Sequence, residues 1–390
     1  MNHSEKFAHF IWNKHSSLQS LPIKEFSKLV APQLVTDVIV PISENQFNIM
    51  SEACQVVDRM MMSPSYRGFY ENQIPQLRDR AHQAPTAGAC LSLDFHIDQN
   101  GAPKLIEANT NAAFLALGID LYRYFEQPLV QNKQSADVAE MFAFEILKSD
   151  HVQDKTNEQF IYIVDETPAN QRLYVEFLVI QSLLQAQGFE CLILDSSELA
   201  GKEPPALVYN RTTDFAFATQ NSQTLRKWFH EDSCVITPNP YHYEMLANKQ
   251  RLIDWHDPSF QEAFAFSEND KTVLQQILLK SWKLNPETAA EIWSRRKSLF
   301  FKPTESFGSK LAFRGGSVSQ AAFAKVIEAG GIAQEYCPPS LIDTPNGSFK
   351  YDLRCFFYDG MVQLIVARLY QGQVTNLQTM GGGFACVKLI

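Results

Sequence analysis

The sequence predicts an α+β protein that contains an α/β segment, and three patterns in its 390 residues support this prediction. Residues 1–85 carry apolar side chains at helical spacing. Residues 93–109 form two apolar arms around Asn100-Gly101, a pair typical of a two-residue hairpin turn. Residues 160–209 alternate short apolar strands with a helical segment, the βαβ pattern of a parallel sheet. A chain of this length usually divides into two or three subdomains.

Composition narrows the class of partner. The net charge of −9 argues against a general nucleic-acid or anionic-membrane surface, because both need a basic field. The seven cysteines show no CxxC pair, which indicates reduced thiols in a cytoplasmic protein. The N-terminus lacks a signal-type apolar core and no apolar run reaches membrane-spanning length, so we expect a soluble protein. The sequence leaves a homodimer open.

The hairpin at residues 93–109 carries the first candidate site. With Asn100-Gly101 as the turn, Asp94 pairs directly with Glu107, and Asn109 shares the face of Glu107. Two facing carboxylates repel unless a cation lies between them. Two carboxylates and an amide oxygen suit Mg²⁺ held against a nucleotide, whereas a solvated acidic face is the alternative that the residues alone leave open.

The middle of the chain predicts a substrate-binding edge. Strands are expected at 160–165, 191–195 and 206–209, with a helix at 170–187. Asn210 and Arg211 follow the third strand, at the carboxyl edge where parallel sheets bind ligands. We therefore predict that these two residues contact substrate, although turn chemistry also explains a polar loop at that position.

The C-terminal third has features of a phosphate site. Lys302 lies near the end of an apolar strand, and a glycine-bearing loop follows with Ser306, Gly308, Ser309 and Lys310. Lys249 stands at an expected helix start. Residues 350–369 form a second hairpin around Asp359-Gly360. No GxxxxGK[ST] or GxGxxG motif occurs, which argues against P-loop and Rossmann folds.

Two motifs together resemble one enzyme family. Asp94, Glu107 and Asn109 are spaced as in the metal-binding hairpin of ATP-grasp ligases, where such residues hold the magnesium of Mg-ATP. Asp352-Leu353-Arg354 resembles a strand of glutathione synthetases and peptide-tailoring ligases. The resemblance covers roughly residues 90–115 and 245–390. The metal hairpin precedes the other motifs here, which resembles the circularly permuted order of glutathionylspermidine synthetase and eukaryotic glutathione synthetase.

The resemblance implies a role for each matching residue. It implies that ATP and Mg²⁺ are the cofactors, that Lys249, Lys302 and the 306–316 loop hold phosphates, and that Arg354 and Arg368 stabilise the transferring phosphoryl group. Arg354 is the first choice of the two, because a strict two-residue turn would put them on opposite faces and a bulge would be needed to bring both into the site. Further nucleotide contacts are implied for Gln334, Glu335, Tyr336, Cys337 and Asp352.

The implied fold is a circularly permuted ATP-grasp fold with an inserted parallel-sheet substrate domain. The expected domains are a helical cap at 1–85, the part with the metal hairpin at 86–148, the substrate domain at 149–240, and a nucleotide-binding part at 241–390 whose phosphate lid spans 297–345.

The implied activity is ATP-dependent ligation of a small-molecule carboxylate to an amine through an acyl phosphate. One departure bears on it, because Ser92 stands where many relatives carry an arginine. Either Arg354, Arg368 or Arg211 substitutes for it, or ligase activity has been lost. Two alternatives to the ligase stay open. One is a small-molecule kinase, for which His96 is the nearby candidate base; the other is a non-catalytic nucleotide-binding module.

Overall fold

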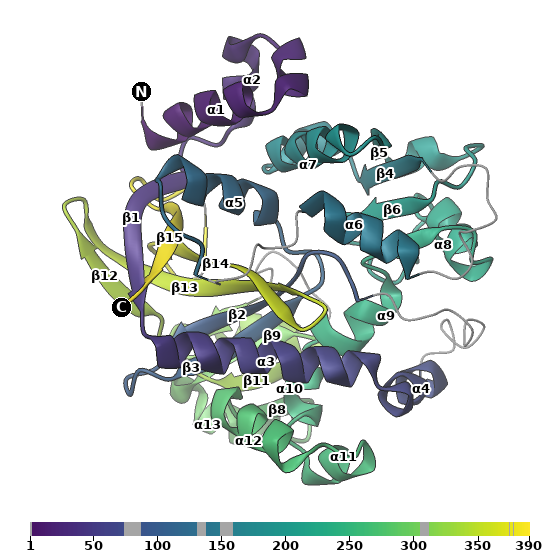
Figure 1. The fold of residues 1–390 in the computed structure, drawn as a ribbon. Helices are drawn as coiled ribbons and strands as arrows, with labels where there is room; N and C mark the ends of the chain where they lie inside the picture. The colour runs from purple at the N-terminus through teal and green to yellow at the C-terminus, as the bar shows by residue number, and fades with distance from the viewer. Residues whose placement is uncertain are drawn as a thin grey trace.

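The computed structural model describes residues 2–73, 87–130, 138–148, 159–304, 312–373, 375–376 and 378–390. In these ranges three β-sheets are surrounded by helices (Figure 1). The α-helices are α1 (His3–Lys14), α2 (Ile23–Leu29), α3 (Glu44–Met62), α4 (Pro64–Gln73), α5 (Leu115–Tyr124), α6 (Val138–Leu147), α7 (Tyr174–Ala186), α8 (Gln223–His230), α9 (Pro240–His242), α10 (Arg251–Asp254), α11 (Pro258–Ala263), α12 (Glu268–Ile277), α13 (Ala289–Ser294) and α14 (Gln320–Glu328).

A seven-stranded sheet joins segments from both ends of the chain. Its strands are β1 (Val35–Ile42), β2 (Leu91–Ile97), β3 (Pro103–Asn109), β12 (Ser340–Thr344), β13 (Gly347–Tyr358), β14 (Met361–Tyr370) and β15 (Gly383–Leu389). They run in the order β1-β15-β14-β13-β2-β3, with β12 added to β13. The early hairpin β2–β3 therefore lies beside the late hairpin β13–β14, which places the two motif-bearing parts of the sequence in one sheet.

The N-terminal segment departs from the expected all-helical cap. Its strand β1 pairs in parallel with β15, so the segment belongs to the main sheet. Some side chains of Val35–Ile42 are buried and others are exposed, as is usual for a strand at the edge of a sheet. Helix α3 follows directly and begins with a capping box, in which Ser43 and Gln46 each accept a hydrogen bond from the other's backbone N–H.

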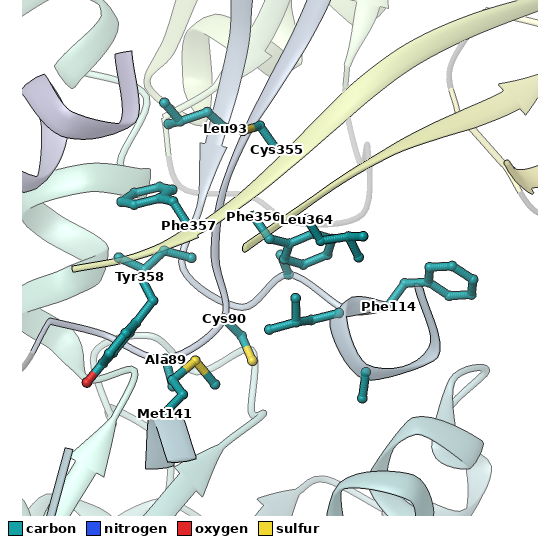
Figure 2. Packing of buried hydrophobic residues seen from close by; sticks show 14 of the residues in the cluster. Ala89, Cys90, Leu93, Phe114, Met141, Cys355, Phe356, Phe357, Tyr358 and Leu364 are labelled. Atoms are coloured by element: carbon teal, nitrogen blue, oxygen red, sulfur yellow. The ribbon is translucent and has the colours of Figure 1, made fainter. Parts of the chain in front are cut away.

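Helices α3 and α5 cover opposite faces of this sheet. Cys355 of β13 lies 3.6 Å from Cys54 of α3, Sγ to Sγ. The next residue along β13, Phe356, faces the other way and pairs with Leu364 of β14, which packs on Gly118 of α5. Figure 2 shows this packing, with Phe356, Leu364 and Phe114 gathered beside the first turn of α5. The core thus buries the middle of β13 on both faces.

The two smaller sheets have four strands each. The antiparallel sheet contains β8 (Ser281–Leu284), β9 (Leu299–Pro303), β10 (Phe313–Arg314) and β11 (Gly331–Glu335). The parallel sheet contains β4 (Phe160–Asp165), β5 (Glu190–Asp195), β6 (Leu207–Asn210) and β7 (Val235–Thr237), as the βαβ pattern predicts. All seven cysteines are buried free thiols. No helix in the described ranges is both long and apolar enough to span a membrane.

Candidate active site

The predicted metal hairpin forms, but its turn differs from the expected one. Asp98 and Ala102 close a three-residue loop, and only Gly101 in it takes a positive φ, of 79°. Phe95 consequently pairs with Leu105, one residue out of the predicted register. A bulge at Ile106 restores the register, so that Asp94 pairs with Glu107 as predicted. The expected two-residue turn was wrong, whereas the expected carboxylate pair was right.

A second bulge brings the two arginines to one face. The turn at Asp359-Gly360 has two residues with positive φ, as its sequence predicts. Phe357 pairs with Val362, but Phe356 pairs with Leu364, so Gln363 is the extra residue. Beyond this bulge, Asp352 lies directly opposite Arg368. Arg354 is two residues from Asp352 and therefore shares its face.

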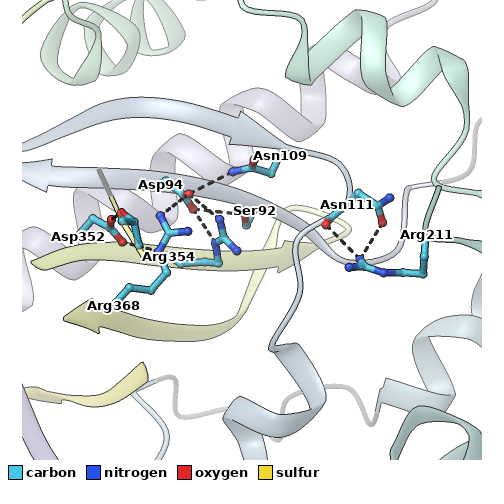
Figure 3. Close-up of polar contacts among 9 residues, drawn as sticks. Ser92, Asp94, Asn109, Asn111, Arg211, Asp352, Arg354 and Arg368 are labelled. Atoms are coloured by element: carbon cyan, nitrogen blue, oxygen red, sulfur yellow. Dashed lines mark hydrogen bonds and ion pairs between the residues drawn. The ribbon is translucent and has the colours of Figure 1, made fainter. Parts of the chain in front are cut away.

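Asp94 is at the centre of the polar cluster on this face (Figure 3). Arg354 donates to both of its oxygens, from Nε to Oδ1 at 2.9 Å and from Nη2 to Oδ2 at 2.7 Å. Arg368 donates from Nη2 to Oδ2 at 2.8 Å, and Asn109 donates to the same oxygen at 3.2 Å. Burial alone would raise the pKa of Asp94, but the two guanidinium groups hold it below its usual value.

Arg368 is held by a second carboxylate. Its Nε donates to Asp352 Oδ1 at 2.6 Å, while Thr375 donates to the other oxygen of Asp352. The result is an alternating row of charges, Asp352, Arg368, Asp94 and Arg354, on neighbouring strands. Arg368 and Asp352 line the cavity described below, whereas Arg354 is not among its lining residues. The geometry therefore favours Arg368, and not the first choice Arg354, as the arginine that meets a ligand.

Glu107 and Asn109 differ from Asp94 in having free oxygens. The Glu107 carboxylate has no hydrogen-bond partner among the described residues, and Asn109 uses only its amide nitrogen, toward Asp94. Both side chains are half-buried and line the cavity. A carboxylate and an amide oxygen two residues apart on one strand are hard oxygen donors that fit a Mg²⁺ ion with open positions for phosphate and water. No group of three His, Cys, Asp or Glu side chains in the described ranges forms a metal-binding cluster.

Two buried lysines lie near Glu107. Lys302 of β9 is 4% exposed and donates from Nζ to the Ile106 carbonyl at 2.7 Å and to Gln334 Oε1 at 2.9 Å. Burial lowers its pKa to about 8, against an opposing effect of Glu107. Burial also lowers the pKa of Lys249, which precedes α10, while Glu107 raises it. Cationic groups at this depth favour an anionic ligand that restores their lost solvation.

The predicted hinge residues line the same cavity. Gln334, Glu335, Tyr336 and Cys337 lie at and beyond the end of β11. Gln334 is 2% exposed, and its amide nitrogen has no hydrogen-bond partner in the structure. Buried polar atoms are seldom left unpaired, so this N–H group is available to a ligand. His96 lies on the other side of the hinge, with Nδ1 2.7 Å from the Cys337 carbonyl oxygen.

The structure separates Asn210 and Arg211, the two residues predicted to contact substrate. Arg211 lines the cavity and donates from Nη1 to the side-chain oxygen and the carbonyl of Asn111, at 2.7 Å and 3.0 Å. Asn210 is buried, bonds to Thr212 and Pro238, and does not line the cavity. Asp165, at the end of β4, does line it, and burial raises its pKa to about 6. Asp165 was missed in the sequence, although its place at a parallel strand end is the same signal that indicated Arg211.

These cavity-lining groups surround a single space of about 560 Å³. The hairpin β2–β3, the lysines, the hinge, Arg368 and the carboxyl edge of the parallel sheet all contribute to its wall. Four predicted lid residues, Ser306, Gly308, Ser309 and Lys310, lie outside the described residues.

Comparison with known proteins gives a fold relationship. No protein-family model matches the sequence, and no curated protein matches it. The structure is similar to that of a glutathione synthetase-like effector from Globodera pallida, with a TM-score of 0.58 and 13% identity over 100% of this chain and 98% of the other. The chain has a glutathione synthetase-like fold. This result confirms, at the level of the fold, the resemblance that the sequence motifs predict.

Two weaker similarities accompany the glutathione synthetase-like one. A candidate gamma-glutamylcysteine synthetase of Methylobacillus flagellatus KT has a TM-score of 0.44 and 9% identity, over 87% of this chain and 88% of the other. The ATP-grasp ligase PsnB, complexed with a precursor variant, Mg and ADP, has a TM-score of 0.31 and 13% identity, over 60% and 88%. Similarity at this level carries no argument about the present chain.

Proposed function

We propose that the protein is an ATP-dependent ligase of the ATP-grasp type, which joins a small-molecule carboxylate to an amine through an acyl phosphate. One observation carries the proposal. A single cavity is lined by two buried lysines, by the free oxygens of Glu107 and Asn109, and by the half-buried Arg368. These are the groups needed to bind a nucleoside triphosphate and to stabilise charge on a transferred phosphoryl group.

In this proposal each group of residues lining the cavity has its own role in the reaction. Lys249 and Lys302 bind the phosphates, and the hinge from Gln334 to Cys337 receives the base. Glu107 and Asn109 would hold Mg²⁺, which offsets charge on the phosphate oxygens when bound. Arg368 stabilises the charge that develops on the phosphoryl group as the substrate carboxylate attacks, and on the acyl phosphate when the amine displaces phosphate.

We place the two substrates on the far side of the cavity. The half-buried Arg211 provides a cation for a carboxylate, and the buried Asp165 provides an anion for an amine. The described residues give no indication of a nucleic-acid partner.

The permuted order and the domain division belong to the same proposal. Hairpin β2–β3 comes early in the chain and pairs with β13, which comes late, and this arrangement supports a circularly permuted ATP-grasp fold. The proposed domains are the N-terminal part at 1–85, which includes strand β1 of the main sheet, the hairpin part at 86–148, the substrate domain at 149–240 and the nucleotide part at 241–390.

The kinase alternative depends on His96 as its candidate base. A carbonyl oxygen only accepts hydrogen bonds, so the 2.7 Å contact with Cys337 requires a proton on His96 Nδ1. This tautomer leaves Nε2 of His96 as an acceptor, and His96 lines the cavity, so the kinase stays an alternative that product analysis decides.

The test begins with calorimetry of Mg-ATP binding to the wild type and to Glu107→Ala with Asn109→Ala. We expect the wild type to bind ATP only with Mg²⁺ and the double variant to lose that dependence. Gln99→Ala with Asn100→Ala, at the exposed tip of the same hairpin, is the matched control and should bind as the wild type does. A wild type that ignores Mg-ATP would overturn the proposal.

Product analysis with panels of carboxylates and amines then separates the functions. ADP with an amide identifies a ligase, ADP with a phosphoester identifies a kinase, and nucleotide binding without ADP formation identifies an inert module.

A further inference from the structure

Asp94 has the wrong surroundings for a ligand of a divalent cation. Its side chain is 1% exposed, and its two oxygens already receive five hydrogen bonds, from Arg354 twice and from Arg368, Asn109 and Ser92. A carboxylate offers about four lone-pair sites, so this one is saturated. Two guanidinium groups within 3 Å would also repel a divalent ion.

The same contacts suit Asp94 to a different task. Arg354 binds it through a bidentate pair, which fixes the carboxylate in the plane of that guanidinium. Oδ2 also accepts from Arg368, whose Nε is fixed in turn by Asp352. Arg368 is thereby held along one edge by two carboxylates, and its Nη1, for which the described residues provide no partner, remains for the cavity that the residue lines.

Arg354 has a different role from Arg368 in this cluster. It does not line the cavity, and its charge balances that of Asp94 inside the sheet. Ser92, the small buried residue two positions before Asp94, donates its hydroxyl to Asp94 Oδ1 at 3.4 Å and so adds to the contacts that hold this carboxylate. The row from Asp352 to Arg354 is therefore a device for holding one arginine, built from alternating charges on three adjacent strands.

We propose that Asp94 is a positioning residue that holds Arg354 and Arg368, and that Glu107 and Asn109 hold the divalent cation of a bound nucleotide without it. This inference rests on the proposed function, because it concerns the same site. Its test uses the full chain and three measurements.

The first measurement is Mn²⁺ binding in the presence of ADP, followed by electron paramagnetic resonance. We expect Glu107→Gln to weaken Mn²⁺ binding at least tenfold and Asp94→Asn to change it less than threefold. Loss of Mn²⁺ affinity in Asp94→Asn equal to that in Glu107→Gln would overturn the inference.

The second measurement covers the case in which Asp94→Asn fails to fold because it leaves two arginines short of a partner. The double variant Asp94→Asn with Arg354→Gln removes one charge of each sign. We expect it to recover stability over Asp94→Asn and to bind Mn²⁺ as the wild type does. If the two substitutions instead add independently in urea unfolding, Asp94 does not hold Arg354 and the inference fails.

The third measurement separates positioning from a merely structural role. ADP with aluminium fluoride mimics the transferring phosphoryl group, which Arg368 is proposed to meet. Asp94→Asn is expected to weaken binding of Mg-ADP with aluminium fluoride at least tenfold while leaving Mg-ADP itself within about threefold. Equal weakening of both ligands would count against a positioning role.

The outcomes also separate this inference from the proposed function. A wild type that binds no nucleotide overturns the function, and the coupling between Asp94 and Arg354 in unfolding still decides whether Asp94 holds the arginine. A wild type that binds Mg-ATP with Asp94 as a metal ligand overturns the inference and leaves the ligase proposal standing.

Discussion

Replacement of Lys302 by methionine should stabilise the folded protein at neutral pH while it removes nucleotide binding. Lys302 is buried at the cavity, and burial lowers its pKa from 10.5 to about 8. The folded protein therefore binds this proton less tightly than the unfolded chain does. Below pH 8 the lysine is charged in both states, and the folded state carries the full cost of the buried charge.

The size of the effect follows from the shift. A difference of 2.5 pKa units between 10.5 and about 8 corresponds to about 3 kcal/mol at pH 7. Methionine removes this cost, but it leaves two acceptors, Ile106 O and Gln334 Oε1, without their donor, at about 1 kcal/mol each. The variant should thus be about 1 kcal/mol more stable than the wild type at pH 7.

The difference in stability between Lys302→Met and the wild type should change sign at alkaline pH. Between pH 8 and 10.5 the unfolded chain binds more protons at this site, so the wild type gains stability as pH rises. At pH 9.5 the gain is about 2 kcal/mol, and the variant becomes the less stable protein by about 1 kcal/mol. Titrating groups that do not interact with Lys302 affect both proteins alike and cancel in the difference.

Urea unfolding at pH 7 and 9.5 measures this difference directly. Lys283→Met, on the same sheet but exposed to solvent, is the matched control and should follow the wild type at both pH values. Calorimetry should also show Mg-ATP binding weakened at least tenfold in Lys302→Met. A stability difference that stays constant across the pH range would refute the reasoning.

Two further predictions concern stability away from the nucleotide. Burial raises the pKa of Glu145, which accepts from Ala87 N and from the Tyr358 hydroxyl, so the folded state binds its proton more tightly and loses stability as pH rises above about 4.5. Glu145→Gln should match the wild type near pH 4.5 and exceed it at pH 7.5 in urea unfolding; a variant that is less stable at both would show that the charged carboxylate is needed. Gly331→Ala should cost about 1–3 kcal/mol, because a Cβ would overlap Val326 and lie 2.9 Å from the Lys302 carbonyl oxygen. Gly68→Ala in α4, where nothing lies within 4 Å of the added carbon, is its control and should gain a few tenths to 1 kcal/mol; equal effects of the two changes would contradict the packing argument.

The pairing of Asp94 with Glu107 shows how far sequence reasoning reaches. Alternation along the two arms and the Asn-Gly turn signal were enough to predict the pair. The predicted turn was wrong, because the loop has three residues and not two. The bulge at Ile106 shifts the pairing back by one residue, so the predicted pair still forms. Bulges depend on twist and packing within the whole sheet, and a single strand's sequence does not encode them strongly.

Arg354 and Arg368 show a limit of a different kind. Counting from the turn put them on opposite faces unless a bulge intervened, and the bulge at Gln363 does intervene. Which of the two meets the cavity depends on β2 and β14 lying on either side of β13. These strands are more than 250 positions apart in the sequence, so the local sequence pattern could not predict which arginine lines the cavity.

The sequence by itself determined the local elements and the chemical types at the site. The spacing of hydrophobic residues predicted the strands and helices of the parallel sheet, and the turn residues predicted both hairpins. The motifs indicated the lysines, the hinge and the oxygen donors. The tertiary structure alone decided which of these groups share the cavity. It added β1 to the main sheet, placed Asp165 beside Arg211 in the cavity wall, and surrounded Asp94 with two arginines. The physical reason is that periodicity and turn preference act within a few residues, whereas burial and charge pairing are set by strands that meet only when the sheet is assembled.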